Sequence, residues 1–314
     1  MSHISTAGRT SVVIPVYNGQ DYLGQALCSV LRQIRPVREI IIIDDGSMHP
    51  VYVPIHSPQI PIRLIRTENR GLGPARNLAA SFCTGEYLAL LDCDDLWHPK
   101  KIALQEEALD KNPHAILCYT RVRHFPRVNT KSPTYTGGLR KSQLKVLWQR
   151  NYILPSSVMV RRSAWLRAGG GDPHLSGVAD WELWWRLAKL GSFAFLDFPL
   201  TFYRRHPGQM TKNLYNMLKE EVTARSLMHR RAYQLLRRLG FSSDTIGQVA
   251  AETRHFFYDY MIYHQRGTGA WREILLGLLR YTNELKAWKL FFRSLTPNNW
   301  ITGLRNRVKR LCSS

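Results

Sequence analysis

Paired cysteines are absent from the sequence. Its five cysteines stand far apart, with no CxxC pair. This spacing argues against a disulfide framework and a structural zinc site, and it favours free thiols in a reducing compartment. The first ten residues contain no apolar segment typical of a signal peptide, and no run of about 18 apolar residues predicts a membrane span. We therefore expect a cytoplasmic protein.

Acidic residues are few in comparison with basic ones. The 314 residues include 23 Asp and Glu against 44 Lys and Arg, a formal net charge of +21. This charge indicates an anionic partner, and nucleic acid, an anionic membrane surface and phosphate-bearing substrates all fit. A nucleic-acid-binding protein would show a basic stripe with interleaved aromatic residues or a known module. We find neither pattern, and we expect no nucleic-acid partner.

The first hundred residues alternate between two hydrophobic periods. Apolar residues at helical spacing predict one helix that Asp21 caps and another that opens at Pro74. Short runs rich in β-branched residues are typical of buried strands, and they occupy residues 11–16, 39–43, 62–65 and 86–91. This alternation predicts an α/β domain with a doubly wound, mostly parallel sheet.

The later part of this domain is less regular. Its pattern predicts a strand at 153–160, a helix at 180–190 and two short strands at 193–196 and 200–203. We place the end of the domain at residue 211, so that residues 1–211 form the catalytic domain and 212–314 a basic helical region.

Polar clusters follow three of the predicted strands. In open α/β sheets the carboxyl edge is where ligands bind, so these clusters predict one site. Carboxylates separated by one residue at the mouth of a strand can share Mg²⁺ or Mn²⁺ with substrate phosphates. The cluster residues are Pro15 and Tyr17 after the first strand, Asp44 and Asp45 after the second, and Asp92, Asp94 and Asp95 after the fourth.

Four sequence blocks together resemble the family 2 glycosyltransferases of the GT-A fold. The blocks are VVIPVYNG at 12–19, EIIIIDDGS at 39–47, NRGLGPARN at 69–77 and GEYLALLDCDD at 85–95. They match the family in order and spacing, and the resemblance extends over about residues 11–211. It implies an inverting enzyme that uses a nucleoside-diphosphate sugar and a divalent cation, Mn²⁺ or Mg²⁺.

The resemblance also implies roles for individual residues. Gly71 would allow close approach of the backbone to the donor, and Arg76 would face the sugar or the phosphates. Asp92 and Asp94 would form the DxD pair that holds metal and diphosphate, and Asp95 would assist either group or the donor sugar. The nucleoside pocket would be lined by Pro15, Tyr17, Asp44 and Asp45.

A second segment of the family pattern concerns the catalytic base. The family usually has a Glu-Asp pair there, followed by aromatic and aliphatic residues; this sequence has Ala179 and Asp180. By resemblance Asp180 is the base, because a carboxylate must take the proton from the attacking hydroxyl. Asp180 could also cap a helix, and Glu182 is a substitute carboxylate in the same segment.

The segment that closes the domain contains His206. By resemblance this histidine would complete the metal shell or contact the diphosphate, although a lone loop histidine is also a common solvated side chain. The neighbouring Arg204 and Arg205 could add positive charge near the phosphates.

The basic helical region allows two interpretations. An amphipathic helix predicted at residues 271–295 could pack on the catalytic domain, or it could lie on the inner face of the plasma membrane. In the second case the enzyme would be peripheral, and the acceptor would be a lipid-linked saccharide rather than a free one. The resemblance favours cell-surface polysaccharide synthesis as the pathway.

Two other functions fit an α/β sheet with clustered acids. A nucleotidyltransferase would carry a basic, glycine-rich loop after the first strand, and residues 15–20 contain no Lys or Arg. An inactive GT-A scaffold would explain Ala179, whereas the intact Asp92, Asp94 and Asp180 argue against it.

Overall fold

The computed structural model describes residues 8–126 and 150–212, together with Gln143, Val146, Leu147 and isolated positions between 217 and 234. The chain divides into two compact units, Met1–Met210 and Thr211–Ser314. All the candidate site residues belong to the first unit. The helix predicted at residues 271–295 lies outside the described residues.

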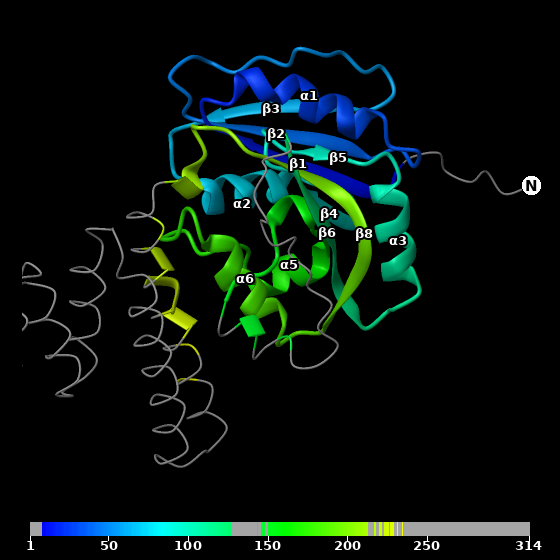
Figure 1. The fold of residues 1–314 in the computed structure, drawn as a ribbon, viewed down its shortest axis with the longest axis vertical. Helices are drawn as coiled ribbons and strands as arrows, with labels where there is room; N and C mark the ends of the chain where they lie inside the picture. The colour runs from blue at the N-terminus through cyan, green and yellow to red at the C-terminus, as the bar shows by residue number, and fades with distance from the viewer. Residues whose placement is uncertain are drawn as a thin grey trace, which may run out of the picture. The chain divides into compact units, whose positions relative to one another are not determined.

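A mixed β-sheet forms the centre of the first unit (Figure 1). Its described strands are β1 (Thr10–Val16), β2 (Glu39–Asp45), β3 (Ile62–Thr67), β4 (Tyr87–Leu90), β5 (Leu96–Trp97), β6 (Ala115–Phe125), β7 (Met159–Arg161) and β8 (Ser192–Arg204). They lie in the order β3-β2-β1-β4-β7-β6-β8-β5. The strands β1 to β4 are parallel, β7 is antiparallel to β4 and β6, and β5 is antiparallel to β8. The prediction of an α/β fold with a mostly parallel sheet is confirmed.

Helices cover both faces of the parallel strands. The described α-helices are α1 (Gln20–Leu31), α2 (Leu72–Phe82), α3 (Lys101–Asp110), α5 (Arg162–Ala168) and α6 (Ala179–Leu187), with short 3₁₀ turns η1 (Pro155–Ser157) and η2 (Met210–Lys212). In Figure 1, α1 and α2 lie on opposite sides of β1 and β2. This arrangement explains why these strands are apolar throughout, since both of their faces are buried.

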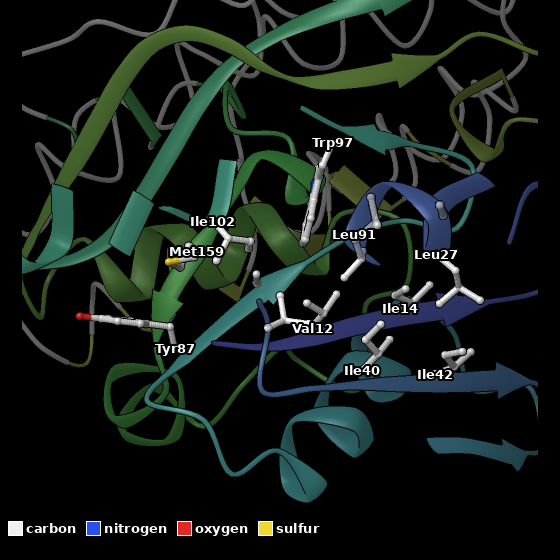
Figure 2. Packing of buried hydrophobic residues seen from close by; sticks show 14 of the residues in the cluster. Val12, Ile14, Leu27, Ile40, Ile42, Tyr87, Leu91, Trp97, Ile102 and Met159 are labelled. Carbon is white, nitrogen blue, oxygen red and sulfur yellow. The ribbon is translucent and has the colours of Figure 1, made fainter. Parts of the chain in front are cut away.

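Successive side chains of a strand point to opposite faces of the sheet, so alternate residues of β1 and β2 pack against different helices. Val12, Ile14, Ile40 and Ile42 are fully buried and pack in one cluster with Leu27 of α1 (Figure 2). The intervening residues of β1 and β2 face α2, which packs against both strands. Burial on two sides fixes the ends of β1 and β2, and therefore the positions of the loops that follow them.

Four sequence predictions need correction in their details. Helix α2 begins at Leu72 rather than at Pro74, and its cap position is Gly71. The residues predicted as a strand at 153–160 form the turn η1 and the short β7, because Pro155 interrupts the apolar run and favours the start of a 3₁₀ turn. The two strands predicted at 193–196 and 200–203 are one continuous strand, β8, with irregular register opposite Arg121. Asp21 does not cap α1, since the cap position belongs to Gly19.

The strand directions bring the candidate residues to one edge of the sheet. β6 and β8 are parallel to each other, and β6 runs in the same direction as β4 because β7 is antiparallel to both. The carboxyl ends of β1, β2, β4, β6 and β8 therefore lie along the same edge.

Candidate active site

The two aspartates at the end of β2 anchor the loops at the carboxyl edge of the sheet. Asp44 accepts hydrogen bonds from the backbone N–H groups of Ser47 (2.9 Å) and Val51 (3.2 Å), and it pairs with Arg66 at 2.7 Å. Burial would raise the pKa of Asp44, but these hydrogen bonds and the Arg66 charge lower it below the usual value. Asp44 is therefore ionised and fixes the loop after β2.

Asp45 ties β2 to the start of α2. Its two carboxylate oxygens accept hydrogen bonds from the N–H groups of Arg70 (2.9 Å) and Gly71 (2.8 Å). Gly71 has a φ of 89°, and an added Cβ would lie 2.6 Å from Oγ of Ser176. The backbone conformation and the close contact both require glycine there. Tyr17, at the end of β1, is 53 % exposed and its ring is accessible at the edge of the sheet.

Arg76 contacts Asp92, the first acidic residue after β4. Its guanidinium, almost completely buried, lies 2.5 Å from Oδ1 of Asp92. Its Nε is buried and makes no hydrogen bond within the described part of the chain. Asp92 is also held from below, because its backbone N–H donates to Oγ of Ser156 at 3.1 Å. A buried arginine with an unused donor at a strand mouth is a suitable contact for an anionic ligand.

Asp94 and His206 are in contact although they lie 112 residues apart in the sequence. Oδ2 of Asp94 is 2.9 Å from Nε2 of His206, and the His206 ring lies 4.7 Å from the ring of Tyr22. Arg204 donates from Nε to the Asp94 carbonyl (2.7 Å) and from its backbone N–H to Asp95 (2.9 Å). The end of β8 thus holds in place the loop Asp92–Asp95, which we call the acidic loop.

The acidic loop carries more negative charge than its neighbours neutralise. Burial raises the pKa of Asp94, and the charge of Asp92 raises it further. Burial raises the pKa of Asp95 as well, and the charges of Asp94 and Asp92 raise it further. Oδ2 of Asp95 is buried and has no hydrogen-bond partner among the described residues. Carboxylates of this kind suit Mg²⁺ or Mn²⁺, and a histidine is a common additional ligand.

The structure assembles only part of the predicted metal set. Asp94 and His206 are in contact, whereas Asp92 faces Arg76. Within the described residues, no three His, Cys, Asp or Glu side chains already converge as a metal-binding group. The residue types and the excess negative charge nevertheless fit a divalent cation at this edge.

Asp180 lies in the first turn of α6, and the cap position of that helix is Val178. Its Oδ2 accepts a hydrogen bond from Nδ2 of Asn151 at 2.9 Å. Burial raises the pKa of Asp180, and the charge of Arg76 acts in the opposite direction. Asn151 therefore holds the Asp180 carboxylate through a hydrogen bond, which Ala179 cannot do because it has no polar side chain. Glu182 is fully buried and pairs with Arg186 at 2.8 Å, so it is not available as a substitute base.

Some residues of the site escaped the sequence analysis. Ser156 lies inside the segment 153–160 that was predicted as a strand, and Asn151 lies just before it. Arg66 follows directly after the strand predicted at 62–65, and the structure includes it in β3. Only a contact between distant segments reveals their roles.

The fold and the acidic edge define a glycosyltransferase of the GT-A class. The profile of the family described as "Glycosyl transferase family 2" matches residues 11–168, half of the chain. The chain belongs to this family. An uncharacterized glycosyltransferase of Rickettsia typhi is 28 % identical over 67 % of this chain and 68 % of its own length.

Two solved structures share the fold. One is S. aureus TarS in complex with UDP-GlcNAc, with a TM-score of 0.56 and 14 % identity over 79 % of this chain and 80 % of that one. The other is a mannosyltransferase from Pyrobaculum calidifontis in complex with GDP-Man and Mn²⁺, with a TM-score of 0.55 and 16 % identity over 92 % and 80 %. At these identities the likeness concerns the fold alone. Among the described residues, no helix has both the length and the apolarity that a bilayer span requires.

Proposed function

We propose that this glycosyltransferase moves a sugar from a nucleoside-diphosphate sugar to an acceptor hydroxyl with inversion at the anomeric carbon. The observation that carries the proposal is the position of Arg76. It contacts Asp92 at 2.5 Å and its charge acts on Asp180. The DxD acid and the candidate base are therefore within electrostatic reach of one buried guanidinium.

Asp180 acts in this proposal as the general base. As the acceptor oxygen attacks the anomeric carbon, its proton passes to the Asp180 carboxylate, and the bond between the sugar and the diphosphate breaks. Asn151 donates to Oδ2 of Asp180 and orients the carboxylate. Because burial raises the pKa of Asp180, the carboxylate is a stronger base than an exposed aspartate would be.

The leaving nucleoside diphosphate develops negative charge, which requires compensation. Arg76 has an unused buried donor that can face this charge. A bound Mn²⁺ or Mg²⁺, held by Asp92, Asp94 and His206, would balance charge on the diphosphate oxygens. Arg204 keeps the acidic loop in position through its hydrogen bonds to Asp94 and Asp95.

The donor nucleoside would lie over the ends of β1 and β2. Pro15 and Tyr17 would supply apolar contacts. Asp44 and Asp45 would fix the surrounding loops, and their remaining lone pairs would accept hydrogen bonds from the nucleobase of the donor. Gly71 would let the backbone approach the donor. The exposure of Tyr17 and the ordered loop contacts of both aspartates support this placement.

The acceptor in this proposal is a saccharide, free or lipid-linked, in cell-surface polysaccharide synthesis. The net charge of +21 also suits a peripheral location on the anionic inner face of the plasma membrane. Association with vesicles that contain anionic lipid, compared with neutral vesicles, tests that location.

The proposal is tested by donor binding and donor hydrolysis across a panel of nucleotide sugars. Each is measured with Mn²⁺ or Mg²⁺ and then with EDTA, for the wild type and for Asp94→Ala. We expect one nucleotide sugar to bind in a metal-dependent way and Asp94→Ala to abolish that binding. The matched control is Glu107→Ala, which removes an exposed acid on α3 whose ion pair, among the described residues, is with the exposed Lys111. A folded wild-type protein that binds no member of the panel would instead indicate an inactive scaffold.

A further inference from the structure

Helix α6, which carries Asp180, takes its position mainly from other helices. Among the described elements its main packing partners are α5 and α2 (Figure 1). Helix α2 packs against β1 and β2, and α5 packs against β7. A general base must lie within hydrogen-bond reach of the hydroxyl that it deprotonates. The contacts among these three helices therefore determine where the Asp180 carboxylate lies.

The turn between α5 and α6 is attached to α2 by Asn77. The Nδ2 of Asn77 donates to the carbonyl of Gly171 at 2.7 Å, and its Oδ1 accepts from the N–H of Gly171 at 2.8 Å. One side-chain amide thus pairs with both backbone groups of a single residue. Asn77 directly follows Arg76 in α2. The same turn of helix therefore carries the arginine of the site and the attachment point of the turn that leads to α6.

A second side chain holds this turn from α6. Arg186 donates to the carbonyls of Ala168 and Gly170, the second at 2.5 Å. Its guanidinium also pairs at 2.8 Å with Glu182, which is fully buried. A planar guanidinium can serve several acceptors at once in a fixed orientation. Glu182 therefore orients Arg186, and Arg186 fixes the turn relative to α6.

The beginnings of α2 and α6 are also in close contact. A Cβ added to Gly73 would lie 2.8 Å from the carbonyl oxygen of Leu175 and 3.0 Å from the Cβ of Ala179. The backbones can approach in this way because Gly73 has no side chain and Ala179 has a short one. Ala179 immediately precedes Asp180, so this contact places the base next to the start of α2.

We propose that Asn77 is a positioning residue for the base Asp180. This role rests on the proposed glycosyl transfer. The oxygen and the nitrogen of the Asn77 amide are both engaged by Gly171, so Asn77 acts through the turn and not on the substrate. It fixes α6, with Asp180, relative to α2, with Arg76. A displacement of about 1 Å in a site can lower the rate by about 10²-fold, so these hydrogen bonds affect catalysis without touching a reacting atom.

The test compares the wild type with Asn77→Ala in the hydrolysis of the nucleotide sugar that binds best in the panel, with water in place of the acceptor. Titration with the same nucleotide sugar gives its Kd and counts the folded donor sites, so that kcat is expressed per site. We expect kcat to fall about tenfold to a hundredfold and Kd to stay within about twofold of the wild-type value. A variant that is merely less stable would lose donor sites but keep its kcat per site.

A second variant and a control accompany Asn77→Ala. Arg186→Lys keeps a positive charge beside Glu182 but lacks the planar group that reaches the carbonyls of the turn. It should show the same kind of loss, and it decides the question if Asn77→Ala does not fold. The matched control is Asn112→Ala, which removes an exposed asparagine whose amide donates to the Ala108 carbonyl at 2.8 Å. The control should change neither kcat nor Kd.

Two results would overturn the proposed role of Asn77. One is a wild-type kcat per site in Asn77→Ala, or in Arg186→Lys where only that variant folds. The other is a nucleotide-sugar affinity that falls as much as kcat in Asn77→Ala, which would place Asn77 at the donor. Failure of the proposed function would look different, because the wild type would then neither bind nor hydrolyse any nucleotide sugar.

Discussion

At the scale of single residues, Arg76 determines the electrostatics of the site. It is buried at the start of α2, it neutralises Asp92, and its charge opposes the effect of burial on Asp180. Asp92 and Asp180, the proposed DxD acid and the proposed base, are therefore coupled through one side chain. Substitutions of these three residues should have distinct effects, although they lie close together.

The substitution Asp180→Asn should abolish transfer and leave donor binding intact. An amide is nearly isosteric with the carboxylate but cannot accept the proton, and general bases typically contribute about 10²–10⁴-fold to the rate. Steady-state transfer kinetics and nucleotide-sugar titration of the same preparation measure the two properties. Transfer within a few-fold of the wild-type rate would show that another group is the base.

The pH profile should report the environment of Asp180. The base must be ionised, and burial raises its pKa, so the transfer rate should fall with decreasing pH at a higher pH than an exposed aspartate would give. Arg76→Gln removes a charge that lowers this pKa, and the acid limb should move to still higher pH. The profile of kcat against pH for both proteins checks the direction, and a shift to lower pH would contradict the coupling.

At the scale of elements, the turn η1 supports the acidic loop. Gln105 of α3 donates two hydrogen bonds of 2.9 Å, to the carbonyls of Cys118 and Ser157, and Trp97 donates to the carbonyl of Ser156 at 2.7 Å. Ser156 in turn accepts from the N–H of Asp92. Helix α3 and strand β5 thus position a site to which they contribute no reacting group.

Helices and strands with a strong hydrophobic pattern can be predicted from the sequence. Segments whose conformation depends on contacts with distant residues cannot. β1, β2 and β4 were predicted from buried apolar runs, and their ends gave the positions of Asp44, Asp45 and Asp92. The apolar run at 153–160 predicted one strand, so η1 was missed, and the contact of Asn151 with Asp180 joins two segments that no local pattern connects. The sequence also does not show that Asp92 pairs with Arg76 while Asp94 contacts His206, because these contacts join residues from distant segments.

Lys101, the first residue of α3, should reduce stability at neutral pH. It is fully buried, with one hydrogen bond to Gln105 (2.7 Å) and its Nζ 4.0 Å from the Trp97 ring centre. Burial lowers its pKa to about 7 from 10.5. At about 1.4 kcal/mol per pKa unit, the penalty at pH 7 is on the order of 5 kcal/mol. Lys101→Met should therefore stabilise the protein, by about 2 kcal/mol after loss of the two contacts.

The pH dependence of this gain has a definite sign. Between about pH 7 and 10.5 the unfolded chain binds a proton at Lys101 and the folded chain does not, so the penalty grows as the pH falls toward 7 and is constant below it. Urea denaturation at pH 7 and at pH 9.5 should give a larger gain for Lys101→Met at pH 7. Lys100→Met changes the exposed neighbour and should have little effect at either pH. An equal gain at both pH values would show that packing, rather than charge, is responsible.

At the scale of the whole molecule, the residues of the site lie between Pro15 and His206, all within the unit Met1–Met210. The prediction that residues 1–211 form the catalytic domain leads to a direct experiment. A chain that ends at Lys212 should fold and bind the preferred nucleotide sugar as the full chain does. Circular dichroism and nucleotide-sugar titration of both chains measure this. A folded shortened chain that binds no donor would assign part of the site to the remaining residues.

The order of the strands has a consequence for how such enzymes diversify. The strands that would frame the nucleoside under the proposed function come from the first 67 residues of the chain, whereas β6, β7 and β8 come from residues beyond 114. Under that proposal, genetic recombination between these two parts would combine one donor-binding part with a different second part, and the loop Asp92–Asp95 would stay at the junction. Donor selectivity would then be inherited separately from the rest of the domain.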